Sequence, residues 1–379
     1  MLKIILLFVA LSSAVCQGIN TDTKAFFETN DSGGNLPANK VYPQGRLFPF
    51  SFYSTGGGSS KKRGDMSQEK LRIADQKKIA AAGATMIGPQ YELDRSILED
   101  AKKLNVKAIY TLRLTIDGEK VGKKYLRNLY KIKKNLDTAK IREAVRREIA
   151  KVGDSNLIAW WNITPEELRY WRKPEMDFLV TVATAIHDFD KKKRPAYLYD
   201  PGHVDAKRLS KSGKYTDIIG KGMYTNYSKM KNSRVYCRWT IEQELEAIKM
   251  IGDQKKVPIA VAEMFQQPAD DELGLIETWA RHDVYCALAA GAKGVLVFSA
   301  RRRPKFTAWE KYLNAYLQIC RELQGELGQK ADPDQALDYF RRAADRRHPA
   351  AMFNFAAMID DGKVPGRGAA DAALYLYRA

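Results

Sequence analysis

Cysteine is scarce in this sequence, and its scarcity excludes one way of stabilising the fold. The 379 residues contain four cysteines. Cleavage of an N-terminal signal after Cys16 would leave Cys237, Cys286 and Cys320, and so sparse and odd a set does not form a disulfide framework. Stability must therefore come from a hydrophobic core, for which the hydrophobic content of 45% is ordinary.

Long apolar runs are equally scarce. The sequence has a single one, which lies near the N-terminus and covers residues 4–15. It follows a basic residue and is too short to cross a bilayer. With Ser12 and Ala14 at positions that fit the small-residue cleavage rule, residues 1–16 are typical of a secretory signal peptide. We therefore expect a secreted or periplasmic protein without a membrane span. Lipidation of Cys16 is the alternative, and it would anchor the chain.

The sequence also lacks motifs that bind nucleic acids, phosphates or metals. His203 has no second histidine or cysteine at ligand spacing, so neither a metal nor another cofactor is expected. The net charge of +18 is instead concentrated between Glu119 and Lys151. Such a run either attracts a polyanion, such as an anionic glycan, or forms the solvated face of a long helix. Without a recognition motif, a nucleic-acid partner is not expected.

Residues 46–325 alternate between apolar segments and helical patterns. The count and rhythm predict an α/β fold of the (β/α)8 TIM-barrel type. A doubly wound open sheet is the alternative, but the glycine-rich fingerprint expected after its first strand is missing. Residues 17–45 are polar and are interpreted as a leader. The predicted strands are residues 47–53, 84–88, 106–112, 156–161, 195–199, 217–224, 257–262 and 293–299.

The composition changes at the C-terminus, where residues 326–379 are rich in alanine at helical spacing. Residues 334–343 (DQALDYFRRA) are echoed by residues 371–379 (DAALYLYRA). This spacing and composition resemble the Sel-like repeat, one of the tetratricopeptide-like solenoids. The barrel should therefore be followed by a short all-α helical-repeat segment. Because one such unit cannot bury its own apolar face, it either packs on the barrel, serves a protein partner or belongs to a longer repeat array.

Polar and aromatic residues follow the predicted strands, at the end of a barrel where active sites lie. Aromatic rings stack on sugar faces, while amides and guanidinium groups hydrogen-bond to hydroxyls, so the set suits a saccharide. The candidates for substrate binding are Tyr53, Gln90, Tyr91, Arg113, Trp161, Asn162, Tyr199, Asp200, His203, Tyr224, Asn226, Tyr227 and Arg301.

Carboxylates follow two of these strands. Glu166 and Glu167 come after the apolar run at residues 156–161, and Glu263 comes directly after residues 257–262. Glycoside hydrolysis needs two carboxyl groups on either side of the bond that is cleaved. The alternative for Glu166 and Glu167 is structural, because glutamates in the first turn stabilise a helix that begins behind a proline.

With these carboxylates, residues 47–323 resemble the clan of TIM-barrel retaining glycoside hydrolases. That resemblance implies that Glu263 is the nucleophile and that Glu166 or Glu167 is the acid/base. Trp161, taken as the tryptophan of a Trp-x-x-x-Asp-Glu pattern, favours Glu166, although the chain has Thr-Pro-Glu-Glu where members of the clan have Asn-Glu. We therefore expect a secreted glycoside hydrolase acting on a poly- or oligosaccharide. The alternatives are an inactive barrel that binds glycans or acts as a scaffold, and a polysaccharide lyase.

Overall fold

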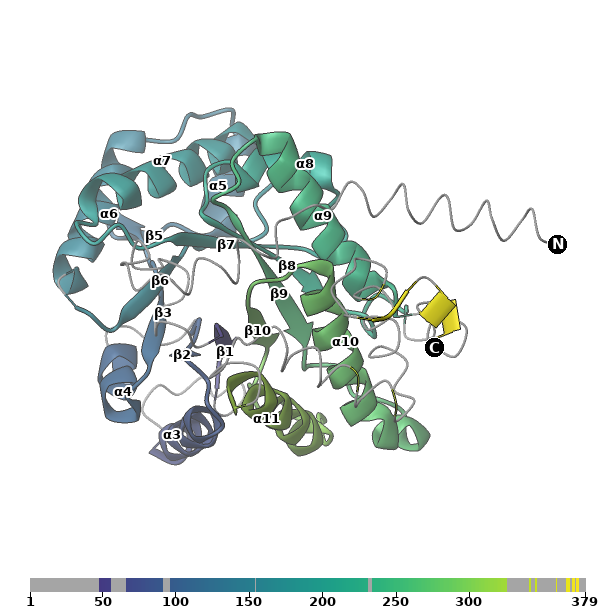
Figure 1. Cartoon of the computed structure of the whole chain (residues 1–379). Helices are drawn as coiled ribbons and strands as arrows, with labels where there is room; N and C mark the ends of the chain where they lie inside the picture. Colours follow the sequence, from purple (N-terminus) through teal and green to yellow (C-terminus); the bar gives the residue numbers. More distant parts are fainter. Residues whose placement is uncertain are drawn as a thin grey trace.

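The computed structural model describes residues 48–55, 66–90, 96–153, 155–230 and 234–325, together with a few separate positions after residue 340. In this part of the chain, eight parallel strands form one sheet that curls into a nearly closed barrel, and helices surround it (Figure 1). The predicted signal peptide, leader and helical repeat lie outside the described residues, apart from those separate positions.

The order of the strands identifies the architecture. Neighbouring strands pair in parallel in the order β1-β10-β9-β8-β7-β6-β3-β2. The two ends of this sheet are linked where Ser51 Oγ donates to the Gly88 carbonyl at 2.6 Å and Ser54 N donates to the Pro89 carbonyl at 2.9 Å. The predicted barrel is therefore confirmed, and the doubly wound sheet is excluded. The strands are β1 (Phe50–Phe52), β2 (Met86–Ile87), β3 (Lys107–Thr111), β6 (Ile158–Asn162), β7 (Ala196–Asp200), β8 (Ile218–Met223), β9 (Val257–Glu263) and β10 (Val295–Phe298).

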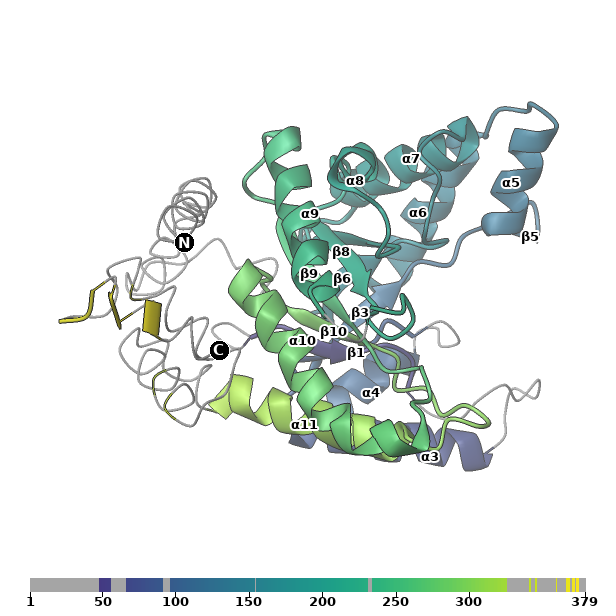
Figure 2. The same ribbon diagram turned by 90° about the vertical axis from the view of Figure 1, so that its right-hand side faces the viewer.

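Helices follow most of the strands and form the outer layer. Figures 1 and 2 both show the first and last described helices, α3 and α11, side by side next to β1 and β10. Among the described residues, no helix combines the length and the apolar character that crossing a membrane requires. The helices are α3 (Met66–Ala81), α4 (Ser96–Leu104), α5 (Lys123–Lys131), α6 (Thr138–Val152), α7 (Lys173–Phe189), α8 (Ala206–Gly213), α9 (Tyr236–Ile251), α10 (Ile276–Ala290) and α11 (Trp309–Gly325), with a 3-10 helix, η1 (Asp270–Leu275), and a hairpin of β4 (Thr115–Ile116) and β5 (Glu119–Lys120).

The hydrophobic core has an inner and an outer layer, because side chains alternate along each strand. Trp160 is fully buried inside the barrel, where its ring lies against that of Tyr197. Its neighbour Trp161 points outward into the layer that α6 and α7 cover. The strands are therefore buried on both faces, which explains why they read as continuous apolar runs.

Two predicted helices differ from those observed. The helix expected to begin at Glu166 begins at Lys173, with Pro174 in its first turn. Glu166 and Glu167 therefore lie in the loop after β6, and their interpretation as first-turn helix residues is wrong. The long basic helix is two helices, α5 and α6, because the Asp137 carboxylate caps a new N-terminus by accepting the Lys140 N–H at 3.0 Å.

The concentrated positive charge lies on α5 and α6, where most lysines and arginines are exposed. Several pair with nearby acids, as Lys140 does with Asp117 at 2.6 Å and Arg146 with Glu143 at 2.7 Å. Exposed pairs of this kind contribute little stability. The arrangement favours a solvated helix face over a dedicated surface for a polyanion.

Candidate functional site

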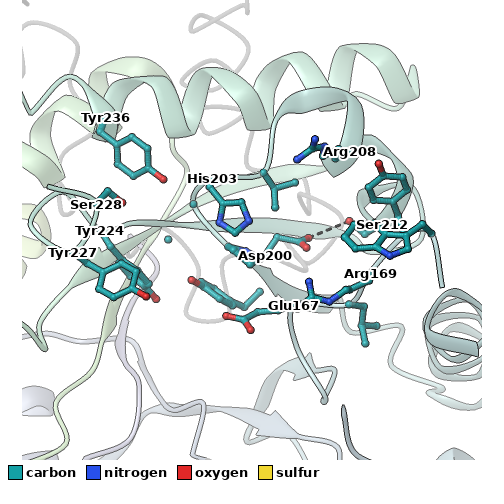
Figure 3. Close-up of a pocket in the computed structure, with 18 of the residues that line it drawn as sticks. Glu167, Arg169, Asp200, His203, Arg208, Ser212, Tyr224, Tyr227, Ser228 and Tyr236 are labelled. Carbon is teal, nitrogen blue, oxygen red and sulfur yellow. Dashed lines mark hydrogen bonds between the residues drawn. The ribbon is translucent and has the colours of Figure 1, made fainter. Parts of the chain in front are cut away.

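A pocket of about 420 Å³ opens at the carboxyl-terminal end of β7 and β8 (Figure 3). The loops after β6, β7 and β8 supply most of its walls, and the ends of β7 and β8, helix α8, the start of α9 and Phe265 after β9 supply the rest. This is the end of a barrel where catalytic groups lie. The lining residues are Glu167, Leu168, Arg169, Tyr170, Trp171, Tyr199, Asp200, Pro201, Gly202, His203, Val204, Arg208, Ser212, Gly222, Tyr224, Tyr227, Ser228, Tyr236 and Phe265.

Aromatic rings form one wall of the pocket. Tyr199 and Tyr224 are stacked with ring centres 6.2 Å apart, and the Tyr224 ring meets Phe265 edge-on at 4.9 Å. Gly222 makes room for this arrangement, since a Cβ there would lie 2.6 Å from the Tyr199 hydroxyl and 2.8 Å from the Tyr224 ring. Tyr227 extends the wall and is largely exposed, so its face is open to a ligand. The wall therefore suits stacking on a sugar ring.

Two carboxyl groups, Glu167 and Asp200, lie in the pocket between tyrosines on one side and arginines on the other (Figure 3). Asp200 ends β7, is buried, and accepts a hydrogen bond from Ser212 Oγ at 3.1 Å. Burial raises the pKa of Asp200 to about 7. A neutral carboxyl group of this kind can donate a hydrogen bond or a proton at neutral pH.

Glu167 is the more exposed of the two carboxyl groups. Its backbone adopts a left-handed conformation with φ of +54°, and its N–H donates to the Tyr199 carbonyl at 3.2 Å. Its carboxylate forms an ion pair with Lys123 of α5. A non-glycine residue in this conformation stores roughly 1 kcal/mol of strain, so the loop holds Glu167 in place against a local preference.

A buried lysine that the sequence analysis did not single out lies beside Asp200 on the neighbouring strand. Lys221 is fully buried, and burial lowers its pKa to about 8. Its ammonium group lies 4.4 Å from the centre of the Trp239 ring, and the backbone N–H of Lys221 donates to the Glu244 carboxylate at 2.8 Å. Burial and the Ser212 hydrogen bond have the two largest effects on the pKa of Asp200. The charge of Lys221 has the next largest effect, and it favours the ionised carboxylate.

Glu263 ends β9 and is 4% exposed. Its carboxylate accepts the backbone N–H groups of Asn226 at 2.8 Å and Tyr227 at 3.1 Å. Burial raises its pKa to about 8 in spite of these two donors. No ion pair between Glu263 and an arginine occurs among the described residues. Glu263 does not itself line the pocket, but it holds the backbone of Tyr227, which does.

Glu166 lies directly before the pocket residue Glu167. One of its carboxylate oxygens is shielded from solvent. Burial, and after it the charge of Glu166, raises the pKa of Tyr197, whose side chain fills the barrel interior and whose hydroxyl bonds to that of Tyr53 at 2.6 Å. The Glu166 carboxylate is therefore close enough to Tyr197 for its charge to act on the tyrosine hydroxyl, and it does not line the pocket.

The pocket brings together six of the residues expected at the mouth from the sequence: Glu167, Tyr199, Asp200, His203, Tyr224 and Tyr227. Other candidates have different surroundings. Trp161 is buried and donates from its ring nitrogen to Asp190 at 2.8 Å, behind the barrel wall. Asn226 donates from its side chain to the Tyr312 hydroxyl at 3.2 Å, under the pocket wall.

The remaining candidates lie on the far side of the barrel mouth or beneath it. Asn162 is fully buried and bonds to Thr111 at 3.4 Å. Arg113 donates to the Gln90 carbonyl at 3.1 Å, and the Gln90 side chain donates to Thr55 at 2.8 Å. Tyr53 is fully buried and Arg301 is half-buried, and neither lines the pocket, whereas Tyr91 lies outside the described residues.

One group of metal-ligating side chains occurs in the described part of the chain: Cys237, His282 and Asp283, on α9 and α10 outside the pocket. His203, the metal candidate weighed from the sequence, is not part of this group. The spacing of His282 and Cys286, four residues apart on a helix, was a usable signal, because such residues share one face. Cys237 reaches them from another helix, and no pattern in the sequence showed that approach.

No protein-family model and no curated protein matches this sequence. Similar solved structures include a β-D-glucuronidase from Dictyoglomus thermophilum, which is 17% identical with a TM-score of 0.43 over 65% of this chain and 44% of that one. Another is a β-glucuronidase from Lactobacillus rhamnosus, 13% identical with a TM-score of 0.49 over 71% of this chain and 49% of that one. This chain thus spans less than half the length of either protein. At these identities the likeness concerns the arrangement of the chain, not its chemistry.

Proposed function

We propose that this protein is a glycosidase-type hydrolase that binds a poly- or oligosaccharide in the pocket at the barrel mouth. One observation carries the proposal: the pocket at the carboxyl ends of parallel strands combines an aromatic wall with two carboxyl groups, Glu167 and Asp200. Concave sites with aromatic surfaces and a few convergent polar groups are typical of small-molecule binding. Raised pKa values in a cleft, such as that of Asp200, are typical of functional groups.

For the chemical step we propose a double displacement with Glu263 as the nucleophile and Glu166 as the acid/base, Glu167 being the alternative acid/base. These residues end or follow β9 and β6, the seventh and fourth strands around the barrel. Glu263 would attack the anomeric carbon while Glu166 protonates the leaving oxygen; water activated by Glu166 would then hydrolyse the glycosyl ester. Glu263 must ionise for this attack, and the two backbone amides supply hydrogen bonds that favour the carboxylate.

The pocket residues would bind and orient the sugar. Asp200, neutral up to a pH of about 7, can donate to a hydroxyl, and Tyr227 can stack on a pyranose face. Arg169 and Arg208 in the opposite wall would favour a glycan with a carboxylate or sulfate group. A faster hydrolysis of neutral glycosides, with no dependence on ionic strength, would contradict this anionic preference. The N-terminal segment supports secretion, which fractionation of cells expressing the full chain would test.

The test of the proposed function is hydrolysis of a panel of 4-nitrophenyl glycosides, neutral and anionic, by the full chain and four variants. Glu263→Gln and Glu166→Gln should each lower kcat/KM by roughly a thousandfold or more. Glu246→Gln, an exposed position on α9, is the matched control and should change nothing. Azide should restore turnover to Glu263→Ala and yield a glycosyl azide, as expected for a nucleophile. Full activity in Glu263→Gln would refute the assignment.

A second candidate function is a barrel that binds glycans without cleaving them. The observation in its favour is that two loop amides hold the Glu263 carboxylate and that Glu263 does not line the pocket. This candidate predicts saccharide binding, measured by calorimetry, without hydrolysis. Binding should then be lost in Tyr227→Ala and retained in Glu263→Gln, whereas the hydrolase predicts turnover that Glu263→Gln removes.

A further inference from the structure

Two helices on the outside of the barrel bring together side chains that commonly bind metals. Cys237 lies in the first turn of α9, and His282 and Asp283 are successive residues in the middle of α10. Their ligand atoms all lie within 4.8 Å of one another. Cys237 Sγ is 4.0 Å from His282 Nδ1, which is 3.1 Å from Asp283 Oδ1.

Cys286 adds a fourth donor to this group. It lies one turn after His282 on α10, so the two side chains share a face of the helix. Its thiol interacts with that of Cys237. The group therefore combines two sulfurs, one imidazole nitrogen and one carboxylate oxygen, drawn from two helices. No disulfide joins these cysteines, since Cys237 and Cys286 are both free thiols.

We propose that Cys237, Cys286, His282 and Asp283 form a binding site for a divalent transition-metal ion of the zinc class. Zinc in structural sites is held tetrahedrally by cysteine and histidine, and carboxylate oxygens are accepted ligands. Softer thiolate ligands exclude magnesium and calcium, which prefer all-oxygen sites.

The charges at the site are suited to such an ion. Two thiolates would balance the two positive charges of the metal. Asp283 is already paired with Arg234, whose Nε donates to Oδ1 at 2.9 Å. A carboxylate has enough lone pairs to bind the ion and keep this partner.

The site also has a route of entry for the ion. Cys237 is fully buried, but the His282 side chain is 34% exposed and Cys286 is half-buried. An ion can therefore reach the donors from the solvent side of α10. A plausible route of entry, together with the right ligand types and number, is what a metal site requires.

A bound ion would stabilise more than the contact between the two helices. Arg234 connects the site to the barrel mouth, because its Nη1 donates to the Asn226 side chain at 3.0 Å. The Asn226 N–H in turn donates to Glu263. The metal would thus fix α9 to α10 and, through Asp283 and Arg234, the loop after β8. This inference does not depend on whether Glu263 is catalytic.

The test uses the purified full chain, freed of metal and titrated with Zn²⁺ alone or Co²⁺ alone. We expect about one ion per chain by elemental mass spectrometry, and thiolate-to-cobalt charge-transfer absorption on adding Co²⁺. Cys237→Ala and Cys286→Ala should each weaken binding by roughly a hundredfold or more. Cys320→Ala is the matched control, because Cys320 is a buried free thiol on α11 that is not among the grouped donors. It should bind the metal like the wild-type protein.

A second measurement keeps the test decisive if a variant fails to fold. Zn²⁺ should protect Cys237 and Cys286 of the wild-type chain from alkylation, leave Cys320 unaffected, and raise the melting temperature. Three results would overturn the proposal: loss of binding in Cys320→Ala as severe as in Cys237→Ala, absence of the cobalt charge-transfer band, or a disulfide between Cys237 and Cys286 in protein that binds no metal.

Discussion

The ionisation of Glu263 makes a sharp prediction about how stability depends on pH. Burial raises the pKa of this carboxyl group to about 8 in the folded protein, whereas an unfolded glutamate has a pKa of about 4.3. Because the pKa is higher in the folded protein than in the unfolded chain, the protonated group contributes fully to the free energy of unfolding below pH 4.3. This contribution is lost as the pH rises to 8. Glu263 should therefore destabilise the fold progressively across this range.

The magnitude follows from the separation of the two pKa values. Each pH unit between them corresponds to about 1.4 kcal/mol, so the loss is at most about 5 kcal/mol at pH 8. Glu263→Gln removes the titration and retains an oxygen that can accept the Asn226 and Tyr227 amides. The variant should match the wild-type protein near pH 4.5 and exceed its stability by a few kcal/mol at pH 8.

The assay is urea unfolding of both proteins at pH 5, 6, 7 and 8, followed by tryptophan fluorescence. Glu246→Gln, at an exposed position of the same protein, should show no such trend relative to wild type. The opposite trend would refute the reasoning. If the stability of wild type increased relative to that of Glu263→Gln with rising pH, the two amides would outweigh burial and Glu263 would be ionised at neutral pH. That outcome would favour a nucleophile that is charged before substrate arrives.

Four further predictions concern stability and can be measured by urea unfolding at pH 7. Gly222→Ala should cost about 1–3 kcal/mol and weaken saccharide binding, because the new Cβ would overlap two tyrosine side chains of the pocket wall. Arg234→Met should cost about 3–5 kcal/mol, since it leaves the buried Asp283 carboxylate without its ion-pair partner. Tyr197→Phe should cost about 1 kcal/mol through one lost hydrogen bond. Lys123→Met removes an exposed ion pair and should cost less than about 1 kcal/mol; a larger loss there than in Arg234→Met would contradict the argument from burial.

The barrel was predictable because its strands are buried on both faces and therefore appear as apolar runs of strand length. Apolar runs do not reveal which side chains point inward, however. Trp160 and Trp161 are adjacent and equally buried, yet one fills the barrel and the other packs under α7. Trp161 was assigned to the mouth because it lies near the end of a strand. Side chains alternate between the two faces of a strand, and this alternation directs Trp161 away from the barrel interior.

Helix boundaries were less predictable for a physical reason that the loop after β6 illustrates. Two prolines, Pro165 and Pro174, could each precede or open a helix, and only the second does. The intervening segment is held by a hydrogen bond from the Glu167 N–H to the Tyr199 carbonyl on the next strand. Such a contact between distant parts of the sequence leaves no local pattern, so the sequence placed both glutamates on a helix.

The polar groups that matter most at the candidate site are joined in the same way, through one loop. Residues 226 and 227, directly after β8, supply the amides that hold Glu263, and Tyr227 also forms part of the pocket wall. Arg234, at the other end of this loop, bonds to the Asn226 side chain and pairs with Asp283 beside the two thiols. Movement of this loop would therefore alter the pocket wall and the surroundings of Glu263 together. A metal ion bound at Cys237, Cys286, His282 and Asp283 would limit that movement from outside the barrel. Removal of the metal should therefore change saccharide binding, although the saccharide does not contact the ion.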